Sequence, residues 1–171
     1  MKLITYAVPV LVLLLSFFYN TNPFIVKEEA RQAYDYLNTV RLHPEQFYDS
    51  LRIDSALHVQ KCTLLWNDTL ARAAEERAFD MARSGYAHDS VSMKLADDSY
   101  FESAVAGSAN GDEAIKTLLI DQNVPTMANR NHLLGIGVSN SNLTDIGIGY
   151  VRCDAGKYRS YACIILAKHD R

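Results

Sequence analysis

Five residues in the second half of the chain carry the donor atoms that metal sites and acid–base catalysis use. They are His88, Glu102, Asp121, Asn129 and His132. Imidazole and carboxylate groups are common ligands of zinc and common general acids and bases, whereas a neutral amide suits zinc poorly. If the first four side chains converge, they form a cleft better suited to a weakly bound divalent cation than to tight zinc binding.

The local sequence around three of these residues favours a cleft. His88 follows Gly85, where a long helix is predicted to stop, and loops at the ends of elements often carry sites. Glu102 lies in the apolar segment SYFESAVAG, so its carboxylate needs a partner or a place at a cleft. Asp121 follows an apolar helix end, where a carboxylate opposes the helix dipole. A solvated loop for His88 and a solvated helix terminus for Asp121 remain open alternatives.

The other possible reactive groups give no comparable pattern. His43, His58 and His169 have no arrangement of acids or thiols at ligand spacing, which predicts surface residues. The sequence contains no Gly-x-Ser-x-Gly segment and no cysteine in a recognisable His-Asn context, so nucleophilic catalysis is not indicated.

Cysteine is scarce in this chain. Cys62, Cys153 and Cys163 allow at most one internal disulfide, and the three possible pairings stay open. Three cysteines are too few to form the frame of the fold, so we interpret them mainly as small apolar residues.

Helices are predicted in the first two thirds of the chain. Apolar residues recur at helical spacing from Lys27 to Arg41, and Pro44 favours a second short helix that ends near Leu51. The segment NDTLARAAEERAFDMARSG has an asparagine N-cap, an alanine-rich face and a terminal glycine. A further helix begins at Gly111 and ends before Pro125.

The last third changes to strand patterns. Residues 143–151 alternate, residues 154–157 form a turn, and residues 161–167 are continuously apolar, which predicts a hairpin whose second strand is buried on both faces. Helices first and antiparallel strands last, with no βαβ rhythm, indicate an α+β layer fold. A chain of 171 residues accommodates one such domain.

Four segments in order resemble the CAP superfamily (the cysteine-rich secretory, antigen 5 and pathogenesis-related 1 proteins, or SCP domain), in its bacterial secreted branch. They are LLWNDTLARAAEERAFDMARSGYAHDS, FESAVAG, AIKTLLIDQNVPTMANRNHLLG and LTDIGIGYV. The resemblance extends from Glu28 to Ala167 and predicts a CAP domain over residues 26–169. It implies an α-β-α sandwich, with a small three-stranded antiparallel sheet between helical layers.

The resemblance also implies a cleft lined by two histidines and two acids. By position, the first histidine is His88, the first acid is Glu102, and Asp121 lies near the second acid. The second histidine of the family precedes an arginine, and in this chain that position is Asn129. His132 lies three residues further on the same helical face and is a peripheral candidate; the alternative is a surface or packing role.

The N-terminal segment MKLITYAVPVLVLLLSFFYNTN has one basic residue followed by an apolar run. This pattern predicts that residues 1–22 are a signal peptide or an N-terminal membrane anchor, and that the protein is exported. The expected location is secreted, periplasmic or anchored at the cell envelope, with membrane contact only through this segment. A net charge of -3 without basic runs argues against nucleic acid as a partner.

The departures from the family cleft favour binding over catalysis. Phe101 and Ser103 flank Glu102 where the family has glycine and asparagine, and Ala128 and Asn129 replace glycine and histidine. We therefore expect a non-catalytic module for a lipid, a sterol or an extracellular protein. The alternative is a metal-dependent hydrolase that uses His88, Glu102 and Asp121, and a structural envelope protein with a vestigial cleft fits the same substitutions.

Overall fold

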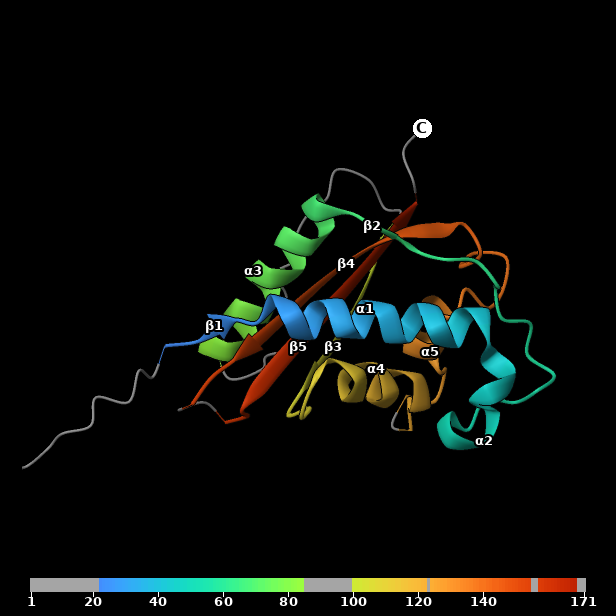
Figure 1. Cartoon of the computed structure of the whole chain (residues 1–171), viewed down its shortest axis with the longest axis horizontal. Helices are drawn as coiled ribbons and strands as arrows, with labels where there is room; N and C mark the ends of the chain where they lie inside the picture. The colour runs from blue at the N-terminus through green and yellow to red at the C-terminus, as the bar shows by residue number, and fades with distance from the viewer. Residues whose placement is uncertain (1–21, 85–99, 123, 155–156, 169–171) are drawn as a thin grey trace, which may run out of the picture.

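The computed structural model describes residues 22–84, 100–122, 124–154 and 157–168 (Figure 1). Its elements in chain order are β1 (Phe24–Ile25), α1 (Lys27–Leu42), the 3-10 helix η1 (Pro44–Gln46), α2 (Tyr48–Leu51), β2 (Leu65–Trp66), α3 (Asp68–Ser84), β3 (Tyr100–Ala106), α4 (Gly111–Ile120), α5 (Ala128–Leu133), β4 (Leu143–Arg152) and β5 (Ser160–Lys168). The predictions for the N-terminal segment, His88 and His169 concern residues outside the described ranges.

The centre of the molecule is an antiparallel sheet built on the β4–β5 hairpin. The strand order is β1-β4-β5-β3, and β2 pairs with β4 in parallel. The continuously apolar residues of β5 are buried from Tyr161 to Leu166, as expected for a strand covered on both faces. The predicted hairpin is therefore confirmed, and the sheet is larger than the expected three strands because the two-residue strands β1 and β2 extend it.

One face of the sheet carries α1, α4 and α5 (Figure 1). The apolar stripe of α1 is buried at Ala30, Ala33, Leu37 and Val40, and it shares a core with Ile115 of α4. The spacing of these residues is the helical period that predicted the element. No helix within the described ranges is long and apolar enough to cross a membrane.

The other face of the sheet is covered by α3, which lies on β4 and β5. Two glycines of β4 permit this close approach: an ideal Cβ on Gly147 would lie 2.1 Å from the backbone nitrogen of Ala71, and one on Gly149 would lie 2.3 Å from the carbonyl carbon of Ala74. The small residues of α3 and β4 therefore face each other across the interface. Helices on both sides of an antiparallel sheet confirm the predicted α+β sandwich.

The cysteines have the roles of small side chains. None of the three forms a disulfide within the described structure, and Cys153 and Cys163 are buried in the core between α3 and the sheet. Burial raises the pKa of the Cys163 thiol well above its ordinary value, which keeps this group protonated.

Candidate functional site

A cavity of about 720 Å³ lies beside β3, between α3 on one side and α4 and α5 on the other. Three of the predicted site residues line it: Glu102 of β3, Asp121 at the end of α4, and Asn129 of α5. We call it the candidate cavity. The structure thus brings together side chains that lie far apart in the sequence, while His88 is outside the described residues.

Most of the wall of the candidate cavity is apolar. Met81 comes from α3, Val105 from β3, Leu118 and Ile120 from α4, and Val124 from the segment that follows it. Ala104 and Ala106 of β3 also line the cavity, and their small side chains leave space beside the strand. A hollow of this size with an apolar wall and a few converging polar groups is typical of a small-molecule site.

Glu102 enters the cavity with a cation already beside it. Its Oε1 accepts a hydrogen bond from Nε of Arg77 on α3 at 2.9 Å, and the two side chains are 25% and 13% exposed. This contact supplies the partner that a carboxylate in an apolar strand requires. The hydrogen bond with Glu102 raises the pKa of the Arg77 guanidinium, which therefore stays charged.

Asp121 is almost fully buried, and both oxygens of its carboxylate accept hydrogen bonds from residues of α5. Oδ1 accepts from Nδ2 of Asn129 at 2.8 Å, and Oδ2 accepts from the backbone nitrogen of Arg130 at 3.2 Å. The residue closes α4 in the left-handed conformation, with φ of 49°. Its unfavourable position at the end of one helix is therefore offset by two donors in the first turn of the next.

Arg130 fixes the position of α5 against its neighbours. This buried guanidinium donates to the carbonyl oxygens of Leu119 and Ile120 at the end of α4, and to that of Leu51 at the end of α2. Helix ends leave such carbonyls without partners, and the cation satisfies them. Asn129 is consequently held at the cavity by its neighbour in sequence.

His132 belongs to the packing of α5. Its ring stacks on Phe101 of β3, with 3.7 Å between the ring centroids and 27° between the planes. Asn129 lines the candidate cavity, whereas His132 is absent from the lining. Burial lowers the pKa of His132, and the Asp121 carboxylate opposes this shift.

The described donors do not make a good metal site. The Glu102 carboxylate forms an ion pair with the Arg77 guanidinium, and both carboxylate oxygens of Asp121 already accept hydrogen bonds from N–H groups. No group of three histidine, cysteine or acidic side chains within the described ranges is placed to hold a metal ion. The arrangement can orient the polar part of a ligand whose remaining surface is apolar.

Among the cavity residues that the sequence analysis missed, Arg77 is the charged one. It stands four residues from Ala73 and four from Met81, so it lies on the apolar face of α3 rather than on its charged face. A charged residue within an apolar stripe needs an explanation, and this signal is readable from the sequence.

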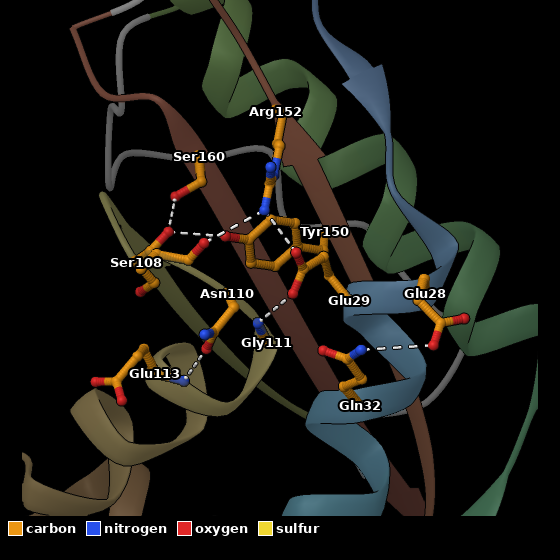
Figure 2. Close-up of polar contacts among 11 residues, drawn as sticks. Glu28, Glu29, Gln32, Ser108, Asn110, Gly111, Glu113, Tyr150, Arg152 and Ser160 are labelled. Carbon is orange, nitrogen blue, oxygen red and sulfur yellow. Dashed lines mark hydrogen bonds and ion pairs between the residues drawn. The ribbon is translucent and has the colours of Figure 1, made fainter.

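A second group of polar residues lies at the turn end of the β4–β5 hairpin (Figure 2). We call it the closed polar cluster, and it comprises Glu29, Ser108, Gly111, Tyr150, Arg152 and Ser160. Glu29 of α1 accepts from the Gly111 nitrogen at 2.8 Å and pairs with Arg152 of β4. The Ser108 carbonyl accepts from the hydroxyls of Tyr150 and Ser160. The cluster joins α1, α4, β4 and β5.

Comparisons with known proteins agree with the fold. The model of the cysteine-rich secretory protein family (CAP) matches residues 34–166. The structure is similar to Schistosoma mansoni venom allergen-like protein 4, with a TM-score of 0.59, 18% identity, and coverage of 85% of this chain and 92% of that chain. It is also similar to an outer surface protein of Borrelia burgdorferi, with a TM-score of 0.55, 16% identity, and coverage of 86% and 98%.

A third similar structure is the crystal structure of NaASP2 with Zn²⁺, with a TM-score of 0.50, 14% identity, and coverage of 81% of this chain and 79% of that chain. At these identities the likeness shows the fold alone. One neighbour is bacterial and another is from Schistosoma mansoni, so they do not assign the chain to a bacterial branch. A search of curated protein sequences finds no match.

Proposed function

The chain belongs to the cysteine-rich secretory protein (CAP) family, and from that premise we propose that it binds a small, mainly apolar ligand, without catalysis, in the candidate cavity. The proposal includes export, because CAP proteins are typically secreted and one structural neighbour is an outer surface protein. The apolar segment over residues 1–22 is the element that would direct export, either as a cleaved signal peptide or as an anchor. A lipid or sterol-like molecule fits this description; an extracellular protein is the alternative partner.

The observation that carries the proposal is the composition of the cavity wall. A volume of about 720 Å³ lies within the range of ligand sites, and aliphatic side chains from three elements line it. The polar lining includes two hydrogen-bonded pairs, Arg77–Glu102 and Asp121–Asn129, together with Thr117 and Gln122. Such a site gains affinity from apolar burial and orientation from a few hydrogen bonds.

The same groups argue against a metal-dependent hydrolase. A divalent cation at Glu102 would have to compete with the Arg77 guanidinium and would be repelled by it. The position that a second imidazole would take holds Asn129, whose amide nitrogen already donates to Asp121. NaASP2 has been crystallised with Zn²⁺, but the described residues of this chain include no group of three histidine, cysteine or acidic side chains placed to hold a metal ion.

A fluorescence titration with the apolar probe N-phenyl-1-naphthylamine tests the proposal. The wild type should bind the probe saturably at one site. Replacing Ala106, which lines the cavity, with Leu should weaken binding at least about tenfold, or about 1.4 kcal/mol. Ala56→Leu is the control, because Ala56 is exposed and does not line the candidate cavity. Absence of saturable binding, or equal binding by the cavity variant, would reject the site.

A further inference from the structure

A second cleft lies at the opposite edge of the sheet from the candidate cavity. It has a volume of about 400 Å³ and opens between the first turns of α1 and of α3, next to β2. Its polar and aromatic lining consists of Lys27, Arg31, Trp66, Asp68, Thr69, Arg72 and Glu75. We call it the basic cleft. Because β2 borders β4 whereas β3 borders β5, the two cavities are separated by the width of the sheet.

Three cations from two helices meet in the basic cleft. Lys27 and Arg31 come from α1 and Arg72 comes from α3, and all three are exposed. None of them forms an ion pair within the described part of the chain, in contrast to Arg77, Lys116 and Arg152. These cations face a cleft without a carboxylate bound to any of them.

The acids of the basic cleft do not cancel this charge. Asp68 accepts a hydrogen bond from Nε1 of Trp66 at 2.8 Å, which directs one carboxylate oxygen toward the indole. Glu75 is the only other acid in the lining. Three cations against two acids leave a formal excess of one positive charge at the cleft.

Trp66 holds one of the guanidinium groups in place. The Cζ atom of Arg31 lies 3.7 Å from the centroid of the indole ring, and the edge of Tyr34 packs against the same ring, with 5.5 Å between centroids. A guanidinium on an aromatic face keeps its N–H groups directed outward along its rim. Arg31 is therefore partly ordered before any ligand arrives, which lowers the entropy cost of binding.

The floor of the basic cleft is made of small side chains. Ala30 of α1 and Ala71 of α3 line it and are buried, with 3% and 6% of their surface exposed. Larger residues here would fill the space between the helices. The cleft consequently has depth for a tetrahedral group beneath the charged side chains.

We infer that the basic cleft binds a phosphate ester anion, with the guanidinium groups of Arg31 and Arg72 as hydrogen-bond donors and Lys27 as an additional charge. Arginine groups recognise phosphate oxygens through two parallel N–H bonds, and an ammonium group adds attraction without a fixed direction. The exposed apolar residues Phe24, Ile25 and Leu65 belong to the strands β1 and β2 on the same edge of the sheet. The anion could thus come from a soluble phosphate ester or from a phospholipid headgroup.

Two probes distinguish these sources. Glycerol 3-phosphate is titrated into the protein by calorimetry, and vesicles of phosphatidylcholine with and without phosphatidylglycerol are co-sedimented with it. The double variant Arg31→Gln/Arg72→Gln should lower the affinity for the bound probe at least about tenfold. Its control is Arg52→Gln/Arg159→Gln, which removes the same charge at exposed positions outside the cleft. A single Lys27→Gln variant should give a smaller loss.

Each outcome decides the inference. Binding of both probes, or of glycerol 3-phosphate alone, assigns the anion itself. Binding only to vesicles that contain phosphatidylglycerol assigns the lipid headgroup. Binding of neither probe would overturn the inference. An equal loss of affinity in the control variant would also overturn it, because the loss would then reflect a general charge effect. Circular dichroism of the double variant verifies the fold. Lys27→Gln, which removes no side-chain hydrogen bond or ion pair within the described residues, keeps the test valid if Arg31 proves necessary for stability.

Discussion

The closed polar cluster and the candidate cavity each contain an arginine–glutamate pair, and their surroundings differ. In the cluster, Glu29 accepts from Arg152 and from the backbone nitrogen of Gly111, and Arg152 also donates to the Ala109 carbonyl. In the cavity, Glu102 accepts from Arg77 alone among the described residues, and the pair faces an open volume. The same residue types therefore join elements of the fold at one place and line a cavity at the other, where we propose that they contact a ligand.

This difference shows why residue type alone does not indicate function. A carboxylate whose oxygens both have partners in the fold contributes to stability, since removing it leaves those partners unsatisfied. A carboxylate with one oxygen toward a cavity contributes less to stability and more to recognition. Variants at Glu29 and Glu102 should separate these two roles.

Replacing Glu29 with Ala should have the largest effect on stability. It leaves the Gly111 nitrogen and the Arg152 guanidinium without their acceptor, so we expect a loss of about 3 kcal/mol in the free energy of unfolding. Chemical denaturation measures this loss. Glu28→Ala is the control, because Glu28 is exposed and its side chain accepts a hydrogen bond only from Gln32 among the described residues, and it should change stability by less than about 0.5 kcal/mol. Equal effects would contradict the structural role of the cluster.

Replacing Asn129 with His should change the chemistry of the cavity rather than its stability. An imidazole would then stand beside Asp121, and zinc affinity should rise about tenfold, or about 1.4 kcal/mol, above a weak wild-type value. Calorimetric titration with zinc measures the change. His132→Ala should leave zinc affinity unaltered, because His132 stacks on Phe101 and does not line the cavity. A fall of zinc affinity below the wild-type value in that variant would make His132 a ligand.

Replacing Glu102 with Gln should cost about 1 kcal/mol of stability, less than the change at Glu29. Glutamine keeps the shape and can still accept from Arg77, but the charge that compensates the guanidinium is lost. The exposed pair between Glu113 and Lys116 supplies the comparison, and Glu113→Gln should cost less than about 0.5 kcal/mol. A loss at Glu102 as large as that at Glu29 would remove the distinction between the two regions.

The smallest expected effect is a pH dependence from His132. Burial lowers its pKa in the folded protein below the ordinary value of 6.5, so the unfolded chain binds more protons near that pH. Stability should therefore fall as the pH is lowered through this region. His132→Phe keeps an aromatic ring against Phe101 and should lose this part of the pH dependence. The same substitution at exposed His58 should retain it.

Local sequence patterns predicted most of the fold, but they could not predict which charged side chains form ion pairs. The apolar stripes of α1 and α3 are signals within single helices, and the hairpin is a signal within one continuous stretch of sequence. The structure confirms all three. Glu29 and Arg152 are 123 residues apart, and no local pattern links them. The grouping of Glu102, Asp121 and Asn129 was expected from the family resemblance, but their actual partners, Arg77 and the first turn of α5, depend on how the helices pack.

A backbone-amide NMR titration with N-phenyl-1-naphthylamine tests the central claim most directly, because it maps the bound ligand onto both regions at once. The account predicts chemical-shift changes at Met81, Val105, Leu118 and Asp121, which line the candidate cavity. The amides of Gly111 and Arg152 in the closed polar cluster should stay unchanged. Changes centred on the closed polar cluster, or no saturable changes around the cavity, would contradict the account.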